Sequence, residues 1–138
     1  MTKEPNESQL NDDSIKEAYF EMQAIQQQMK QMYQQIKIIE NQVQEFEEVA
    51  EAVKNLKDKT GSEIFASLGG GVFARGELKH NNKFIVNIGA NVAVEKNGDE
   101  TFELLKKQIE ELKSYKEQLL KGMQLLESRA KEIEKMVS

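Results

Sequence analysis

Apolar residues recur at alternating spacings of three and four along two long stretches of this chain. An unbroken alternation of this kind has a period of 3.5 residues, which keeps one apolar stripe facing a partner helix in a left-handed supercoil. The positions are Ile15, Ala18, Met22, Ile25, Met29, Met32, Ile36, Ile39, Val43, Phe46, Ala50 and Val53 in the first stretch, and Phe102, Leu105, Ile109, Leu112, Lys116, Leu119, Met123, Leu126, Ala130, Ile133 and Val137 in the second. Both stretches are therefore predicted to be coiled-coil helices.

The segment between these stretches changes to the period of two that is typical of β-strands. Gly69-Gly70-Gly71 separates two alternating runs and supplies a turn, because glycine enters positive φ at little cost. Gly89-Ala90-Asn91 separates two further runs, so the segment is predicted to form two β-hairpins. A single hairpin is too small to be stable in water and leaves strand edges exposed. We therefore expect the two-hairpin segment to oligomerise through its apolar residues. These residues are Ile64, Phe65, Leu68, Val72, Phe73, Leu78, Phe84, Ile85, Val86, Ile88, Val92 and Val94.

These patterns divide the chain into four segments. Residues 1–13 are expected to be a flexible N-terminus, 14–60 a coiled-coil helix, 61–96 the two hairpins and 97–138 a second coiled-coil helix. Asp12, Asp13 and Ser14 are candidate caps of the first helix, and Asp99 and Glu100 of the second. Lys116 interrupts the second apolar stripe, where a lysine can extend its ammonium group to water and select the register or the partner.

The two helices are predicted to pack against each other as an antiparallel coiled coil in an α+β fold. Each apolar stretch is roughly 55 Å long at 1.5 Å per residue, so the helices match in reach. Val53 should then lie near Phe102, and Ile15 near Val137. The alternative is two parallel coiled coils formed with other subunits, with the hairpins between them. A connection of about 48 residues closes an antiparallel pair easily, which favours the intramolecular arrangement.

Composition disfavours several classes of function. The net charge of −5 gives no attraction to nucleic acid or to an anionic membrane surface, and no apolar stretch is long enough to span a bilayer. The chain has no cysteine, and its single histidine, His80, lies in a predicted turn without a catalytic partner at motif spacing. The glycine run lacks the lysine of a phosphate-binding loop. We expect a cytoplasmic protein that is not an enzyme and uses no metal or other cofactor.

Apolar residues also gather near the two chain ends, which the antiparallel arrangement brings together. Phe20 and Leu125 fall at outward-facing heptad positions, and five methionines map to this half of the helices. Methionine suits an adaptable apolar binding surface, but scattered exposed apolar residues and an ordinary soft core are the alternatives. If the helix ends fray, apolar partners could contact Ile15, Phe20, Met22, Ile25, Leu125, Ile133, Met136 and Val137.

The whole chain resembles the α class of the prefoldin family, most specifically in SLGGGVFARGEL and KFIVNIGANVAVEK before the second helix. The resemblance implies a hexamer of two α and four β subunits, built around a double β-barrel formed by the hairpins. It also implies ATP-independent capture of non-native polypeptides at the helix ends and their transfer to a group II chaperonin. The alternative is a structural or filament-forming coiled-coil protein related to prefoldin.

Overall fold

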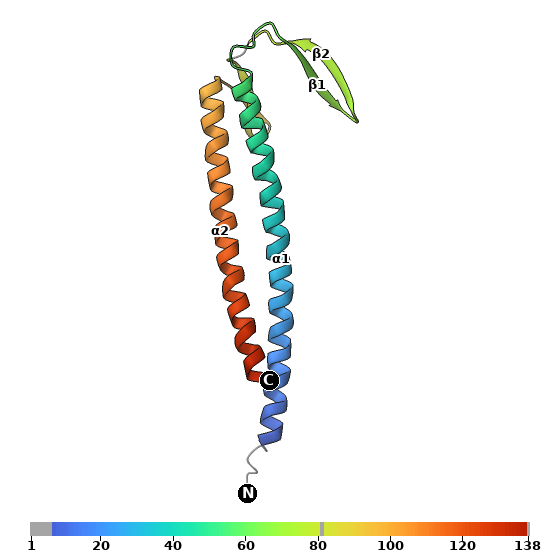
Figure 1. The fold of residues 1–138 in the computed structure, drawn as a ribbon, viewed down its shortest axis with the longest axis vertical. Coiled ribbons are helices and arrows are strands. Elements are labelled where there is room, and N and C mark those ends of the chain that lie inside the picture. The colour runs from blue at the N-terminus through green and yellow to red at the C-terminus, as the bar shows by residue number, and fades with distance from the viewer. Residues whose placement is uncertain (1–6, 81, 138) are drawn as a thin grey trace. The chain divides into compact units, whose positions relative to one another are not determined.

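The computed structural model describes residues 7–80 and 82–137. Along the chain, the long helix α1 (Glu7–Asn55) is followed by four strands and then by a second long helix, α2 (Gly98–Val137) (Figure 1). The strands are β1 (Glu63–Gly69), β2 (Val72–Glu77), β3 (Phe84–Gly89) and β4 (Val92–Lys96). The chain divides into two units, one made of residues 1–40 and 113–138 and the other of residues 41–112. We call them the terminal unit and the hairpin unit. The predicted α+β class with two helices and two hairpins is confirmed.

In the terminal unit, the first half of α1 packs against the second half of α2. Ala18, Ile25 and Ile133 form its buried cluster, and Ile133 is only 1% exposed. Residues near opposite chain ends therefore meet, as an antiparallel pair requires. The half-buried side chains packed on this cluster are Met22, Met29, Leu126 and Ala130. All of them occupy positions of the two apolar stripes.

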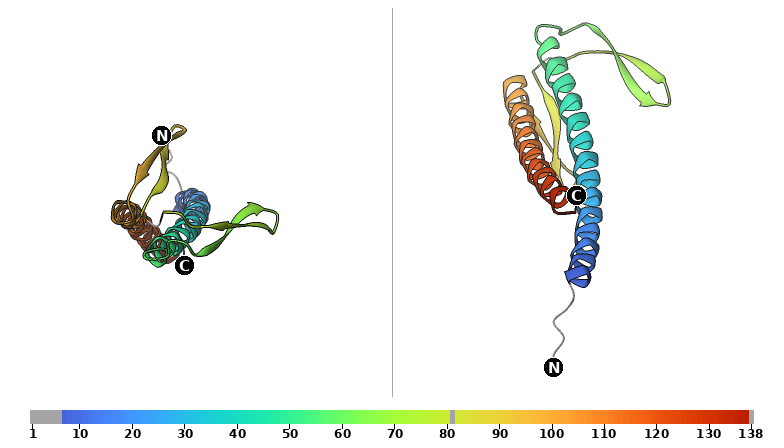
Figure 2. Two further views of the ribbon diagram at one scale, coloured as in Figure 1. Left: turned by 90° about the horizontal axis from the view of Figure 1, so that it is seen from above. Right: turned by 60° about the horizontal axis from the view of Figure 1, so that its bottom comes forward.

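The hairpin unit contains a second core, in which the end of α1 packs against the beginning of α2. Ala50, Val53 and Leu105 are buried there, and Phe46 and Phe102 pack against them. The predicted proximity of Val53 and Phe102 is thus confirmed. Phe84 at the start of β3 joins the same cluster, so this strand lies beside the helices, which Figure 2 also shows.

The apolar stripes account for the burial along both helices. Every stripe position is buried or half-buried except Ile15 and Val137, which are 49% and 46% exposed. Lys116 is half-buried, and its Nζ reaches Oε1 of Glu40 at 3.1 Å. The ammonium group thus leaves the apolar stripe for an ion pair at its side, as a lysine at such a position is expected to do.

The four strands form two separate two-stranded antiparallel sheets, β1–β2 and β3–β4 (Figures 1 and 2). Gly70 and Gly71 form the first turn with φ of 59° and 80°. The second turn uses Ala90 and Asn91, with φ of 51° and 61°. Positive φ is unfavourable for alanine, so the second turn carries backbone strain that the first avoids.

The helix boundaries and caps differ from those expected. α1 already begins at Glu7, so Asp12, Asp13 and Ser14 lie inside it and do not cap it. No proline follows Pro5, so nothing in the backbone stops the helix from starting this early. α1 ends at Asn55 rather than at residue 60. Residues 1–6 of the expected flexible N-terminus lie outside the described residues.

The cap of α2 is Asn97 rather than Asp99. The Glu100 backbone N–H donates to Asn97 Oδ1 at 2.7 Å, and the Asn97 backbone N–H donates to Glu100 Oε1 at 3.1 Å. This reciprocal pair is a capping box, in which Asn97 is the cap and Glu100 its partner three residues later. The Gly98 N–H donates to Asn82 Oδ1 at 2.9 Å, which ties the helix start to the loop before β3.

Candidate functional site

Large apolar side chains are exposed near the ends of both helices in the terminal unit. Phe20, Leu125 and Met136 are 68%, 73% and 68% exposed, which is more than most apolar side chains of this chain. Ile15 and Val137 line a shallow pocket of about 180 Å³ together with Ser14, Ala18 and Met136. The predicted proximity of Ile15 and Val137 is therefore confirmed. We call Ile15, Phe20, Leu125, Met136 and Val137 the helix-end surface.

The remaining residues suggested for partner contact are not on this surface. Ile25 and Ile133 belong to the buried cluster of the terminal unit, and Met22 is half-buried against it. A partner could reach Ile25 or Ile133 only if α1 and α2 separated locally. Their contact with a partner stays a prediction, and it requires opening of the helix pair.

Tyr19 is an exposed aromatic residue that heptad reasoning missed. It is 62% exposed, and its ring packs edge-to-face against Phe20, with centroids 6.5 Å apart. Gln23 Nε2 donates to the Tyr19 hydroxyl at 3.1 Å. The two adjacent aromatic residues could have been noticed in the sequence, because both fall outside the apolar stripe. Tyr19 enlarges the apolar area next to the helix-end surface.

One ion-pair cluster joins the two helices next to the exposed apolar residues. Arg129 donates from Nε to Glu21 Oε1 at 2.6 Å and from a terminal nitrogen to Glu21 Oε2 at 3.1 Å, and it also contacts Glu132 on its own helix. The hydrogen bond from Arg129 lowers the pKa of Glu21, and the same bond raises the pKa of Arg129. A two-point contact of this kind has a defined geometry, so it holds the helix ends in one register.

The hairpins carry the second exposed apolar surface. Phe65, Leu68, Val72 and Phe73 on the first hairpin are each at least 56% exposed. On the second hairpin, Ile85, Ile88 and Val92 are exposed, while the alternate positions Phe84, Val86 and Val94 are half-buried. Ile64 and Leu78 are half-buried as well. The second hairpin is thus partly covered, and the first is largely free.

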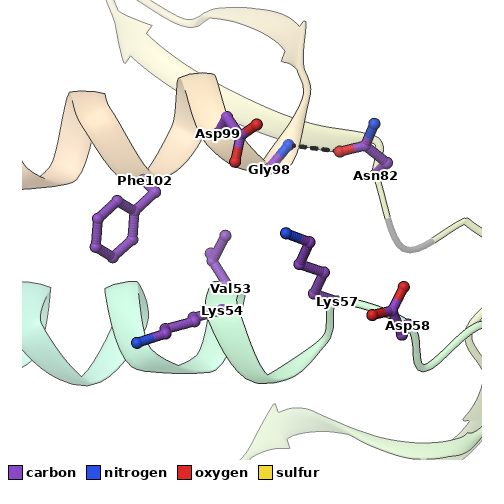
Figure 3. A pocket seen from close by; sticks show the side chains of 8 residues that line it. All are labelled: Val53, Lys54, Lys57, Asp58, Asn82, Gly98, Asp99 and Phe102. Carbon is purple, nitrogen blue, oxygen red and sulfur yellow. Dashed lines mark hydrogen bonds between the residues drawn. The ribbon is translucent and has the colours of Figure 1, made fainter.

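One pocket of the hairpin unit lies where the end of α1 meets the start of α2 (Figure 3). It encloses about 550 Å³. Val53 and Phe102 provide apolar surface, and Lys57 extends toward the start of α2 (Figure 3). The other lining residues are Lys54, Asp58, Asn82, Gly98 and Asp99. Acidic and basic groups are mixed here, so the pocket presents no uniform charge to a ligand.

The described part of the chain holds no cluster of side chains suited to binding a metal ion. Among residues 7–80 and 82–137, no group of three or more histidine or acidic side chains is placed to hold a metal ion. In those same ranges, neither helix has a sufficiently long apolar stretch to pass through a bilayer. The two exposed apolar surfaces are of a kind that suits contacts with other polypeptides.

Comparisons with known proteins agree with this architecture. The family model described as prefoldin subunit matches residues 13–138. "Prefoldin subunit alpha" of Thermofilum pendens is 37% identical over 87 residues, which cover 62% of this chain and 67% of that protein. "Prefoldin subunit alpha" of Methanobrevibacter smithii is 32% identical over 82 residues, covering 59% of this chain and 56% of that protein. The matches thus span between about half and two thirds of these relatives.

A solved structure has the same fold. A chain in the cryo-EM structure of filamentous PFD from Methanocaldococcus jannaschii superposes with a TM-score of 0.75, covering 82% of this chain and 94% of that chain. The sequence identity is 16%, so the likeness concerns the fold alone.

Proposed function

The chain belongs to the prefoldin family, and we propose that it acts as an α-class subunit of a cytoplasmic, ATP-independent chaperone that captures non-native polypeptides. The α subunits of this chaperone-associated family assemble into oligomeric complexes. In our proposal the hairpins join this chain to four β-class subunits and a second α subunit. The helix ends contact the client, which then passes to a group II chaperonin.

The observation that carries the proposal is the helix-end surface. Ile15 of α1 and Met136 and Val137 of α2 line one pocket, and Phe20, Leu125 and Met136 are each more than two thirds exposed. Monomeric proteins seldom leave apolar groups clustered in this way without a partner. An unfolded polypeptide exposes the same kind of apolar groups, so the two are chemically complementary.

Each such contact is weak by itself. Full burial of a phenylalanine or leucine side chain contributes about 1.5–3 kcal/mol, before the cost of ordering a flexible client is subtracted. One helix-end surface therefore releases a client readily. Several surfaces held in one assembly raise the effective concentration of binding sites, so retention becomes useful while each contact stays reversible. Release then needs no ATP hydrolysis, because a competing receptor can take the contacts one at a time.

The hairpins supply the assembly that multivalent binding requires. Their exposed apolar residues and free strand edges favour pairing with further hairpins. We propose that the twelve hairpin residues named above contribute to a closed β-barrel shared between subunits. A barrel would remove the exposed edges and bury the exposed apolar residues of each hairpin.

The test combines this chain with a β-class prefoldin subunit and measures both assembly and client protection. Native mass spectrometry should find a discrete complex of two α and four β subunits. That complex should suppress the aggregation of a chemically unfolded model protein, followed by light scattering without ATP. Replacing Phe20 and Leu125 by serine should leave the complex intact and reduce the suppression.

Ile38→Ser is the matched control. Ile38 is 58% exposed and belongs to the same unit, but it is not part of the helix-end surface. This substitution removes an exposed apolar side chain outside the helix-end surface, so suppression should stay at the wild-type level. Equal suppression by the Phe20 and Leu125 variant would remove the helix-end surface from the proposal.

Two further measurements test the transfer of client to a chaperonin and the alternative that the chain forms filaments. Fluorescently labelled client should move from the complex to added group II chaperonin on a native gel, and failure to move would refute the delivery step. Formation of long homopolymers with no discrete complex in the presence of the β-class subunit would instead support the filament-forming alternative.

A further inference from the structure

Asn97 is the only asparagine in this sequence that a glycine follows, and the dipeptide lies between β4 and α2. The backbone nitrogen after an asparagine can attack the carbonyl carbon of the asparagine side chain, because the two atoms close a small succinimide ring. Glycine hinders this attack least, since it has no Cβ. Asn97–Gly98 therefore has the residue types of a site of spontaneous deamidation.

The reaction at such a dipeptide has two steps and consumes only water. In the first step the Gly98 nitrogen forms a bond to Asn97 Cγ, the Cγ–Nδ2 bond breaks, and the proton of the Gly98 N–H leaves through water with the departing ammonia. In the second step water opens the succinimide. Attack at Cγ gives aspartate, whereas attack at the main-chain carbonyl carbon gives isoaspartate, in which the main chain runs through Cγ.

Two hydrogen bonds of the folded chain oppose ring closure. The Gly98 N–H donates to Asn82 Oδ1 at 2.9 Å (Figure 3), and the Glu100 N–H donates to Asn97 Oδ1 at 2.7 Å. The nitrogen of a succinimide carries no hydrogen, so closure of the ring eliminates the first bond. It also draws Asn97 Cγ onto the backbone, which breaks the second. Both contacts must therefore open before the reaction can proceed.

Gly98 is the residue that this packing requires. A Cβ added to Gly98 would lie 3.3 Å from Asn82 Oδ1 and 3.7 Å from Cε2 of Phe84. The first distance is too short for comfortable contact, so a larger residue would displace the Asn82 carbonyl group. The glycine that admits Asn82 is thus also the residue that leaves the peptide nitrogen accessible to Asn97.

Burial does not protect the dipeptide. Asn97 is exposed and Gly98 is half-buried. Asn82, Gly98 and Asp99 line the pocket of about 550 Å³ between the end of α1 and the start of α2, which has room for water. Water can therefore reach the ring once it forms, and the hydrogen bonds are the feature that restrains the reaction.

We propose that Asn97–Gly98 is a deamidation site, and that the hydrogen bond from Gly98 to Asn82 sets its rate. A reaction that proceeds through a transiently open form is as fast as that form is populated. Loss of one ordinary hydrogen bond raises the open population about fivefold. The inference concerns the start of α2 alone, so it does not depend on the proposed chaperone activity.

The two products should affect α2 differently. Aspartate keeps a side-chain oxygen for the Glu100 N–H and is a favourable residue at a helix N-cap. Isoaspartate adds a methylene group to the main chain between positions 97 and 98, so the cap and the contact with Asn82 cannot both be kept. The first turn of α2 should then open more readily, which loosens the connection between α2 and the β3–β4 hairpin.

The test measures deamidation of the full-length chain in mildly alkaline buffer, by mass spectrometry of peptides prepared in mild acid. Asn82→Ala removes the acceptor of the Gly98 N–H, whereas Asn82→Asp keeps an acceptor oxygen. Asn82→Gln displaces the carbonyl group by one methylene and is a milder second variant. Asn87→Ala is the matched control, because it removes an asparagine oxygen that accepts from the Gly89 N–H at 2.9 Å in the same hairpin.

Folded wild-type chain should form aspartate and isoaspartate at position 97 at least about tenfold more slowly than the same chain in urea. Asn82→Ala should react about fivefold faster than folded wild type, with Asn82→Gln faster in the same direction, whereas Asn82→Asp and Asn87→Ala keep the wild-type rate. Hydrogen exchange of the Gly98 N–H should accelerate by the same factor in Asn82→Ala. Equal rates in folded and denatured wild type, no acceleration in both Asn82→Ala and Asn82→Gln, or equal acceleration by Asn87→Ala would each overturn the proposal.

Discussion

Replacing Ile133 by alanine tests whether this residue belongs to the core of the terminal unit rather than to its binding surface. Ile133 is 1% exposed and packs with Ala18 and Ile25. The substitution removes three carbon atoms, which loses about 2.4 kcal/mol of transfer free energy at about 0.8 kcal/mol per methylene. The cavity that remains between two helices adds to this loss, so the free energy of unfolding should fall by about 3 kcal/mol. For a chain of this length that corresponds to a thermal midpoint about 10 °C lower.

Leu125→Ala is the matched comparison, because it also truncates a branched side chain on the same helix. Leu125 is 73% exposed, so its loss should change the free energy of unfolding by no more than about 0.5 kcal/mol. Thermal unfolding followed by circular dichroism at 222 nm measures both changes. Similar midpoints for the two variants would refute the division of these residues into core and surface. At temperatures where both variants are folded, Leu125→Ala should suppress client aggregation less than Ile133→Ala does, although it is the more stable variant.

Three further changes test local features of the structure. Asn97→Ala should lower the free energy of unfolding by about 1 kcal/mol in chemical denaturation, since it removes the cap of α2, whereas Asp99→Ala, outside the capping pair, should have a smaller effect. Glu21 has a lowered pKa in the folded chain, so its contribution to stability is present above its ordinary value of about 4.5 and is lost as pH falls through the folded pKa. Glu21→Gln should therefore make unfolding less pH-dependent in mild acid, and an unchanged profile would contradict the contact with Arg129. Ala90→Gly should relieve the strain at φ 51° and slow hydrogen exchange in the β3–β4 hairpin.

The periodicity of the sequence was sufficient for the helices and their packing. The 3.5-residue repeat depends only on residue type and spacing, and every position of the repeat except Ile15 and Val137 is buried or half-buried. Gly69-Gly70-Gly71 was equally informative, because three successive residues with positive φ are tolerated by glycine and by few others. Asn97 was missed as a cap because the acidic residues that follow it matched the expected charge at a helix start.

The candidate site was only partly accessible to sequence reasoning. The heptad pattern placed Phe20 and Leu125 outside the apolar stripe, and both are exposed. The heptad pattern does not indicate whether α1 and α2 stay packed against each other near the chain ends. Ile25 and Ile133 were expected to become available by fraying, but both are buried where the two helices pack.

The sequence by itself determined the order of the helices, strands and turns, but not the ends of α1, because backbone preferences and apolar periodicity act over a few residues at a time. Only the tertiary structure decided how those elements pack and which of their residues contact each other. The hydrogen bond from the Gly98 N–H to Asn82 joins residues that are 16 positions apart. Pairing of Phe84 with Lys96 in the β3–β4 hairpin brings these residues together, so their contact becomes visible only once the register of the strands is known.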